Sequence, residues 1–548
     1  MTTSEAGACQ DKFQRYLDRT GLDKKDYQVK GVEWCIERET KGIAIHLNEK
    51  TTKIIRGGIM ADEMGLGKTI QMLGTVVCNF KRQTLIVLPR ALLDQWANAI
   101  AKTLGHHALI YHAIPKKNKA AMNVKLQSSP IVITTYGMIA VTKKQKKQLS
   151  PLHDIEWSRI IFDEAHHLRN KSTGEYGGAL KLKAAIVWMV TGTPIQNRVS
   201  DLYSLLDILK VPQSYYLHCE EILHELTTQL ILHRTKAGVG LILPALSADT
   251  ESIKWKNKIE RNLAERLHRQ IGGCYYIAEG AEGTGAEGAG TTSAEGTLEE
   301  DEDGDDGPVL LKILRARQVC ILAALLNAPQ QQKQPNSSKI KAVIAKIVER
   351  KENGKHKLVF CHYRGEIDFI KAILVNDYQM NVSVIDGRTK INERRKILEQ
   401  AAAATAAEEQ ASAGQAQGEI LILQIQTGCE GLNLQKFSEV YFVSPHWNPA
   451  VEEQAIARCH RIGQTAETDV FRFYMNGFAS ASDAGAGTSA SEAGAGSSAS
   501  EAGAGTSTSA SDAGSGAGAG GIVKKRSLDE YISIVQLKKK EIVTKILW

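Results

Sequence analysis

The sequence predicts an α/β protein of two lobes, each a parallel sheet covered by helices. Three observations support this fold class. Short β-branched runs alternate with helical patterns in both halves of the 548 residues, which is typical of parallel sheets covered on both faces. A low-complexity spacer, residues 278–307, separates the halves. Only the first half carries a glycine-rich G-L-G-K-T motif, so another feature must explain the second half.

The apolar runs place the strands. In the first half we expect strands at 58–60, 84–88, 131–134, 160–162 and 186–190. In the second half we expect them at 357–360, 382–385, 420–423, 440–443 and 470–474. Each run is short, as buried strands of parallel sheets are.

These patterns divide the chain into seven segments. They are an N-terminal segment (1–24), lobe one (25–237), a helical linker (238–277), an acidic low-complexity spacer (278–307), lobe two (308–478), a second low-complexity spacer (479–521) and a C-terminal helix (522–548). The two spacers contain too few large apolar residues to offset the entropy of ordering, so we expect flexible connections.

Composition limits the class of protein. Hydrophobic residues make up 43% of the chain, which is ample for sizeable cores. The net charge is +7 despite the acidic run at 299–306, so the remainder suits a polyanionic partner, although lysine runs are also common in solvated loops. The nine cysteines form no C-x-x-C pair, which argues against a zinc ribbon. With no signal peptide and no long apolar segment, we expect a soluble intracellular protein without a membrane partner.

The strongest chemical motif is D-E-M-G-L-G-K-T, Asp62 to Thr69. Gly65 and Gly67 allow backbone N–H groups to approach a phosphate closely. Lys68 is expected to reach the β- and γ-phosphates, and the Thr69 hydroxyl to ligate Mg²⁺. A strict loop of this type has glycine where this chain has Asp62, which we include among the nucleotide-binding residues.

A second motif, D-E-A-H at 163–166, follows the apolar run 159–162. At the end of a strand, Asp163 is expected to hold the metal and Glu164 to orient and activate the attacking water. Alone, either motif is also compatible with a surface loop or a solvated strand end. Together, each after an apolar run, they predict hydrolysis of a nucleoside triphosphate with Mg²⁺.

The second half supplies Gln454, Arg458 and Arg461. Spacings of four and three residues place these side chains on one face if the segment is helical. Two guanidinium groups on that face predict arginine fingers that neutralise the transferring γ-phosphoryl group across an interlobe cleft. By itself the pattern also fits a surface helix with two solvated arginines.

With these motifs in place, the sequence resembles the SWI/SNF-type helicase-related ATPases of superfamily two, over residues from about 25 to 475. The W-N-P element followed by R-I-G-Q is specific to this family among helicase-like proteins. The resemblance implies two RecA-like lobes with ATP and DNA at the interlobe cleft. It looks closest to the DNA-repair and transcription-termination branch and to the compact versions of large DNA viruses. The supporting segments are 26–28, 84–89, 95–96, 133–136, 191–197, 232–236, 314–320, 428–434, 446–449 and 461–464.

The resemblance also implies roles for further residues. Gln28 would read the adenine, and Gly431 and Gln454 would join the nucleotide contacts. Thr191 and Thr193 would couple the state of the γ-phosphate to lobe closure. The residues implied at DNA are Thr134, Thr135, Asn433 and Trp447. The lobe-two motif departs from the family pattern, with Gln426 in place of lysine and Cys429 in place of glycine.

The function implied is a DNA-dependent ATPase that translocates on double-stranded DNA. It would remodel or displace DNA-bound proteins, such as nucleosomes or polymerase, without strand separation. We expect a monomer that uses ATP and Mg²⁺ in the nucleus, or in a viral factory if the chain is viral. Two alternatives stay open. One is a strand-separating DNA or RNA helicase, against which W-N-P and R-I-G-Q argue. The other is a nucleotide-gated DNA-binding scaffold with little turnover, which only Gln426 and Cys429 favour.

Overall fold

The computed structural model describes residues 3–547, except 49–50, 142–148, 197, 218, 272–308, 327–336, 409–417, 429–431, 433 and 479–525. Both predicted spacers therefore lie outside the described residues. The chain forms two compact units. The first joins residues 1–251, 343–473 and 532–548, and the second joins residues 252–342 and 474–531.

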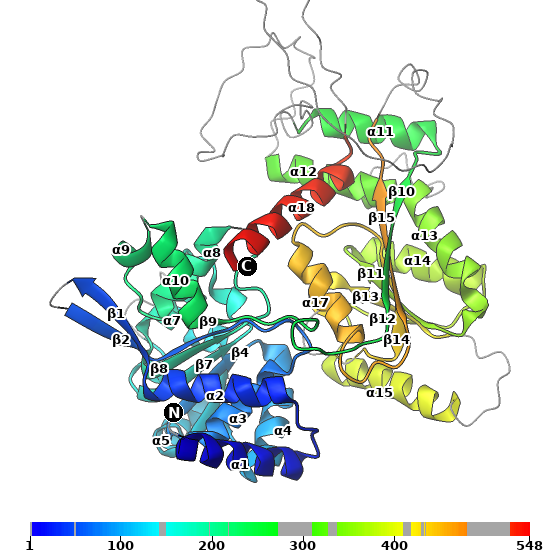
Figure 1. Cartoon of the computed structure of the whole chain (residues 1–548). Helices are drawn as coiled ribbons and strands as arrows, with labels where there is room; N and C mark the ends of the chain where they lie inside the picture. The colour runs from blue at the N-terminus through cyan, green and yellow to red at the C-terminus, as the bar shows by residue number, and fades with distance from the viewer. Residues whose placement is uncertain are drawn as a thin grey trace, which may run out of the picture. The chain divides into compact units, whose positions relative to one another are not determined.

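The first unit contains a seven-stranded sheet in the order β5-β6-β4-β7-β8-β3-β9. Figure 1 labels β4, β7, β8 and β9 of this sheet. Every neighbouring pair of these strands is parallel. The strands are β3 (Gly57–Met60), β4 (Thr84–Leu88), β5 (Leu109–Tyr111), β6 (Ile131–Thr135), β7 (Glu156–Asp163), β8 (Lys183–Val190) and β9 (Ile231–Leu232). A separate antiparallel pair is formed by β1 (Ile43–Asn48) and β2 (Thr51–Ile55).

Helices cover both faces of this sheet, as β4 shows directly. Leu85 and Val87 belong to one core cluster, whereas Ile86 and Leu88 belong to the other, and all four are buried. Side chains of a strand alternate between faces, so an unbroken apolar run identifies a strand buried on both sides. The α-helices of this part are α1 (Thr3–Thr20), α2 (Asp26–Thr40), α3 (Lys68–Cys78), α4 (Leu93–Leu104), α5 (Lys119–Ser128), α6 (Tyr136–Ile139), α7 (Gly174–Lys181), α8 (Val199–Ile208), α9 (Gln213–Tyr216) and α10 (Glu220–Leu230).

The second sheet has six strands in the order β10-β15-β14-β11-β13-β12. They are β10 (Leu246–Ile253), β11 (His356–Cys361), β12 (Val382–Ile385), β13 (Ile420–Gln424), β14 (Phe437–Phe442) and β15 (Thr468–Met475). The associated helices are α13 (Ser338–Glu349), α14 (Arg364–Asn376), α15 (Ile391–Glu408), α16 (Ile425–Gly428), α17 (Pro449–Cys459) and α18 (Leu528–Leu547). The predicted class, two parallel sheets covered by helices, is confirmed.

Several strands were not predicted, because the strand itself is very short or its sequence is polar. Strand β9 has only two residues, and β5 only three. Strand β10 is polar and mostly exposed, with only Ile253 buried. It lies in the segment predicted as a helical linker (238–277), so that prediction was wrong for its first part; a helix, α11 (Lys258–Arg269), follows.

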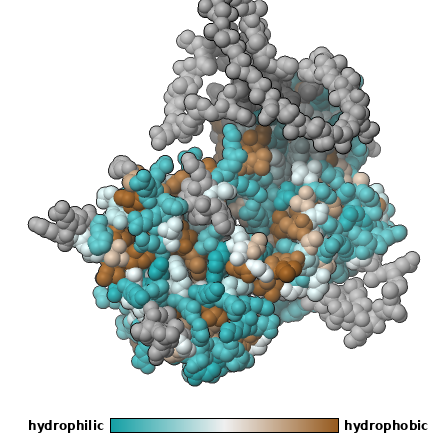
Figure 2. All heavy atoms as spheres, in the orientation of Figure 1, coloured by the Kyte–Doolittle hydropathy of each residue, from teal (hydrophilic) through white to brown (hydrophobic). Residues whose placement is uncertain are grey.

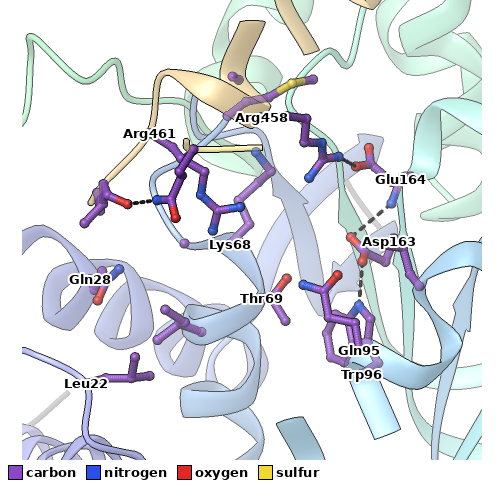
Figure 3. A pocket seen from close by; sticks show the side chains of 18 residues that line it. Leu22, Gln28, Lys68, Thr69, Gln95, Trp96, Asp163, Glu164, Arg458 and Arg461 are labelled. Carbon is purple, nitrogen blue, oxygen red and sulfur yellow. Dashed lines mark hydrogen bonds and ion pairs between the residues drawn. The ribbon is translucent and has the colours of Figure 1, made fainter. Parts of the chain in front are cut away.

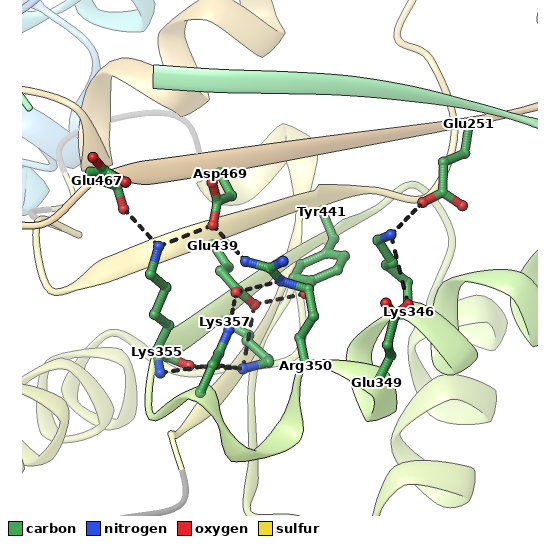
Figure 4. Close-up of polar contacts among 11 residues, drawn as sticks. Glu251, Lys346, Glu349, Arg350, Lys355, Lys357, Glu439, Tyr441, Glu467 and Asp469 are labelled. Atoms are coloured by element: carbon green, nitrogen blue, oxygen red, sulfur yellow. Dashed lines mark hydrogen bonds and ion pairs between the residues drawn. The ribbon is translucent and has the colours of Figure 1, made fainter. Parts of the chain in front are cut away.

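A buried ion-pair network stabilises the amino-terminal edge of the second sheet (Figure 4). Glu439 accepts hydrogen bonds from Arg350 Nε at 2.7 Å and from the Tyr441 hydroxyl at 2.7 Å. The ammonium group of Lys357 lies 3.3 Å from the same carboxylate. Burial lowers the pKa of Lys357, and the charge of Glu439 opposes this shift. Charged groups at this edge are therefore paired with one another.

The second unit is largely helical and includes α11 and α12 (Val309–Ile321). Its apolar core includes Ala264, Leu267, Val319 and Phe478. A buried ion pair joins Lys339 to Asp529 within this unit. In the described part of the chain, no helix combines the length and the apolar character needed to cross a membrane.

Candidate functional site

A cavity of about 380 Å³ lies between the carboxyl edge of the first sheet and the end of α17 (Figure 3). All five predicted catalytic residues line it, together with four of the predicted nucleotide contacts. The predicted residues in its lining are Gln28, Gly65, Gly67, Lys68, Thr69, Asp163, Glu164, Arg458 and Arg461. Leu22, Ile70 and Ile462 add an apolar part of the lining. The parallel strands explain the gathering, because their carboxyl ends meet at one edge of the sheet.

The loop between β3 and α3 has the geometry of an anion site. Gly65 and Gly67 have φ angles of 98° and 79°, in the left-handed region that favours glycine. A Cβ at Gly67 would lie 2.5 Å from Gln28 Nε2, so a larger residue would also require the Gln28 side chain to shift. Lys68 begins α3, at the helix end where backbone N–H groups and the helix dipole favour a phosphate.

The ammonium group of Lys68 donates to the backbone oxygen of Asp62 at 2.7 Å. Burial lowers the pKa of Lys68, while the charges of Glu164, Asp62 and Asp163 act in the opposite direction. The lysine is therefore held inside the loop by the loop's own carbonyl group, and phosphate oxygens are stronger partners for an ammonium ion than a carbonyl oxygen is.

The Asp62 side chain does not line the cavity. It is fully buried and forms a two-pronged ion pair with Arg234, with distances of 2.9 Å from Nε to Oδ1 and 2.5 Å from Nη2 to Oδ2. Two residues after Arg234, the backbone N–H of Lys236 donates to Glu63 Oε2 at 2.7 Å. The acidic pair that opens the phosphate loop is thus held by the segment after β9. The geometry gives Asp62 a bracing contact, whereas the sequence had grouped it with the nucleotide contacts.

Asp163 is the last residue of β7, and two donors orient its carboxylate. Trp96 Nε1 donates to Oδ2 at 2.6 Å, and the backbone N–H of Glu164 donates to Oδ1 at 3.1 Å. Burial and the neighbouring charge of Glu164 raise the pKa of Asp163 to about 7, and both hydrogen bonds oppose that shift. A bound cation would favour the ionised form.

Glu164 adopts a left-handed backbone conformation with φ of 52°, which is uncommon outside glycine and often found at functional sites. Its Oε2 lies 3.3 Å from His166 Nδ1, and its Oε1 lies 3.9 Å from Arg458 Nη2. Burial raises the pKa of Glu164, but His166, Arg458 and Lys68 outweigh burial and lower it to about 2. The carboxylate is therefore ionised at neutral pH and can accept a hydrogen bond from water.

The two arginines reach the cavity from different local structures. Arg458 lies in the last turn of α17, but the helix ends at Cys459, so Arg461 lies beyond it. The prediction that Gln454, Arg458 and Arg461 share one helical face was therefore wrong for Arg461. Burial and the charge of Arg458 lower the pKa of Arg461. In the described part of the chain, the buried Nε of Arg461 has no hydrogen-bond partner, so this group can donate to a bound anion.

Gln28 and Gln454 occupy different parts of the site. Gln28 lines the cavity near Leu22 and donates to the backbone oxygen of Leu66 in the phosphate loop at 3.2 Å. Gln454 lies on α17 and donates to Glu164 Oε1 at 3.5 Å. The role of Gln28 in reading a base stays a prediction.

The predicted DNA contacts are not brought into the cavity. Thr134 is buried in β6 and donates to the backbone oxygen of Tyr111 at 2.8 Å, while the Thr135 hydroxyl pairs with His112 Nδ1 at 3.1 Å. Trp447 is half-buried, and its backbone oxygen accepts from Lys539 Nζ at 2.7 Å. Gly431 and Asn433 lie outside the described residues.

The predicted coupling residues form a connected loop after β8. The backbone N–H of Thr193 donates to Thr191 Oγ1 at 3.2 Å. Gln196 Nε2 in turn donates to Thr193 Oγ1 at 3.0 Å. The resemblance placed Gln196, Trp96 and Arg234 within family segments but did not indicate the contacts that these side chains make. Apart from the contact of Gln196 with Thr193, those partners lie far away in the sequence.

Comparison with known proteins agrees with this geometry. Residues 27–263 match the family model of the SNF2-related domain, and residues 338–463 match that of the helicase conserved C-terminal domain. The chain is 25% identical over 474 residues to the "Probable global transactivator" of Orgyia pseudotsugata multicapsid polyhedrosis virus, covering 82% of this chain and 86% of that protein.

Two further similarities are more partial. The chain is 26% identical to "ATP-dependent DNA helicase DDM1" of Arabidopsis thaliana, covering 83% of this chain and 59% of that protein. Among solved structures, it is similar to the "Sulfolobus solfataricus SWI2/SNF2 ATPase core in complex with dsDNA". That similarity has 22% identity and a TM-score of 0.35, and covers 83% of this chain and 88% of that one.

Each family model covers one of the two segments that supply the catalytic side chains of the cavity. The first contains the phosphate loop and the acidic pair, and the second contains Arg458 and Arg461. The chain belongs to the SWI/SNF-type, helicase-related ATPases of superfamily two and is an ATP hydrolase.

Proposed function

We propose that this ATPase is DNA-dependent and translocates on double-stranded DNA, remodelling or displacing DNA-bound proteins without separating the strands. The observation that carries the proposal is the composition of the cavity. Lys68 and Glu164 come from the first sheet, while Arg458 and Arg461 come from the second. Hydrolysis then requires both lobes at once, so each turnover can be linked to relative movement of the lobes.

The residues divide the work of phosphoryl transfer. The phosphate loop and Lys68 bind the β- and γ-phosphates, and the ionised Glu164 orients the attacking water. Arg458 and Arg461 neutralise charge that develops on the γ-phosphoryl group. The Thr69 hydroxyl and the Asp163 carboxylate supply the oxygen ligands that Mg²⁺ prefers, and the ion would neutralise phosphate charge when bound.

DNA would act as the track. Contacts with the phosphate backbone are independent of sequence, which suits a motor that must move along any duplex. The names of the relatives support a task on DNA, since they include a DNA helicase and DNA repair proteins. We propose nucleosomes or polymerase as displaced proteins, a monomer as the active form, and the nucleus or a viral factory as its location.

The test is steady-state ATP hydrolysis without nucleic acid, then with duplex DNA, single-stranded DNA or RNA. Lys68→Ala serves as the blank, and Lys119→Ala, at an exposed lysine of α5, as the matched control. Stimulation by duplex DNA, followed by displacement of a triplex-forming strand without unwinding of a forked duplex, would support the proposal. Stimulation by single strands or RNA with unwinding would favour a strand-separating helicase. Absence of turnover under all conditions would favour a DNA-binding scaffold.

A further inference from the structure

Two buried amide side chains meet between the two halves of the first unit. Asn448 Nδ2 donates to Gln196 Oε1 at 3.0 Å, although the residues lie 252 positions apart. Gln196 is 6% exposed and Asn448 is 7% exposed. Neither residue lines the nucleotide cavity, and both line a separate cavity of about 460 Å³ together with Gln454.

Gln196 ties this contact to the loop after β8. Its Nε2 donates to Thr193 Oγ1 at 3.0 Å, and its backbone N–H donates to Asp201 Oδ2 at 3.0 Å. The backbone N–H of Thr193 in turn donates a hydrogen bond to Thr191 Oγ1. Both the side-chain amide and the backbone N–H of Gln196 are therefore held by hydrogen bonds, and the position of the amide depends on the conformation of this loop.

Asn448 ties the contact to α17. Its Oδ1 accepts from the backbone N–H of Ala450 at 3.1 Å, which caps the amino terminus of the helix. Its backbone N–H donates to His446 Nδ1 at 3.0 Å. The capped helix carries Gln454 and Arg458, which approach Glu164 at 3.5 and 3.9 Å. The amide contact is thus shorter than either of these polar contacts to the catalytic glutamate.

We propose that Gln196 and Asn448 are positioning residues, an amide pair through which the loop after β8 sets the placement of α17 and hence of Arg458. The inference rests on the proposed function. If the two amides separate, a buried donor and a buried acceptor each lose their partner, which costs free energy unless water replaces the contact. The pair therefore disfavours partly closed arrangements, and a change in the loop is passed to the helix that carries the arginine.

The substitutions Gln196→Glu and Asn448→Asp test the pair in a double-mutant cycle. Either change alone leaves a donor and an acceptor, because the remaining amide can rotate and the Thr193 hydroxyl can reverse its role. Asp at 448 also keeps the helix cap. Only the double variant sets two carboxylates against each other. The matched control is Gln127→Glu with Asn376→Asp, at exposed positions in the two halves.

We expect each single variant to keep ATP turnover with duplex DNA within about fivefold of the unmodified protein, and the double variant to fall at least about tenfold below the product of the single effects. Asn448→Ser provides a second test, since serine caps the helix but is too short to reach Gln196. It should lower turnover with DNA while leaving the affinity for a fluorescent ATP analogue within about threefold.

A distance measurement separates this inference from the proposed function. Fluorescent labels at positions 127 and 376 should report closure on addition of ADP and beryllium fluoride, with or without DNA stimulation. Failure of the double variant to close, with unchanged melting temperature, would support the pair even if DNA proved not to be the activator. Additive effects in the cycle, or normal closure in the double variant and in Asn448→Ser, would overturn it.

Discussion

The indole N–H of Trp96 donates to Oδ2 of Asp163 at 2.6 Å, and both side chains are buried. This bond and the one from the Glu164 backbone fix the plane of the carboxylate. An oriented carboxylate can bind a cation with less loss of freedom than a rotating one. Trp96 therefore orients the proposed metal ligand, and its indole N–H, a donor only, would not itself bind a cation.

Trp96→Phe should raise the Mg²⁺ concentration needed for half-maximal ATP turnover by about tenfold or more, because loss of such a supporting hydrogen bond commonly has that effect. The measurement is a Mg²⁺ titration of turnover, paired with calorimetric Mg²⁺ binding in the presence of ADP. Trp157→Phe is the matched control, since that buried indole donates to the Leu152 backbone at 2.9 Å. Equal Mg²⁺ curves for both variants would contradict the assigned role.

Arg234→Met should destabilise the first unit, because it leaves the buried Asp62 carboxylate without its cation. Removing one partner of a buried ion pair typically costs about 3–5 kcal/mol. Chemical denaturation measures the change in the free energy of unfolding. The control is Arg395→Met, whose ion pair with Glu399 is exposed and should contribute no more than about 1 kcal/mol. Adding Asp62→Asn to Arg234→Met should recover part of the loss, and no recovery would argue against charge burial as the cause.

Arg461→Ala should leave ATP binding largely intact while lowering the turnover rate by about a thousandfold, the usual scale for a missing arginine finger. The buried, unpartnered Nε of Arg461 in the described part of the chain is the structural reason. Single-turnover hydrolysis and a binding assay with a fluorescent ATP analogue separate the two effects. Arg395→Ala serves as an exposed control. A normal turnover rate for Arg461→Ala would show that this arginine does not act in hydrolysis.

The sequence predicted most of what local pattern can encode. Short runs of mostly apolar residues located ten strands, although some of the runs contain a polar residue such as Ser383 or Arg472. A strand buried on both faces needs no polar positions. The phosphate loop and the acidic pair were predictable because their chemistry requires a fixed local spacing. The phosphate loop and the acidic pair both line the cavity, so the two motifs lie together in the fold.

What the sequence could not indicate depends on distant contacts. Arg234 meets Asp62 across 172 positions, and Trp96 meets Asp163 across 67, so neither pair has a local signature. The position of Arg461 was missed for another reason. The helix was expected to continue through Arg461, but His460 leaves the helical conformation with ψ of 80°. Gly463, with φ of 96°, is a local signal for a helix end that the prediction did not use.

His268 makes the second unit sensitive to acid. The imidazole is buried, with Nε2 accepting from the Leu528 backbone at 2.9 Å and Nδ1 donating to the Ala264 oxygen at 2.6 Å. Burial lowers the pKa of His268 to about 4, although Ala264 and Asp529 oppose the shift. A second proton on Nε2 would face the Leu528 N–H, so the folded unit favours the neutral ring.

Because the folded pKa lies below the unfolded value of about 6.5, the unfolded state binds the proton more readily. Stability is thus complete above about pH 6.5 and declines as the pH falls towards 4, by about 3 kcal/mol at most. Hydrogen exchange of the amides in α11, measured from pH 7.5 to 4.5, should show this loss in the unmodified protein but not in His268→Gln. His107→Gln, at an exposed histidine, is the control. Other groups also titrate in this range, so the decisive quantity is the difference between variants: parallel pH curves for His268→Gln and the unmodified protein would mean that this ring does not carry the acid sensitivity.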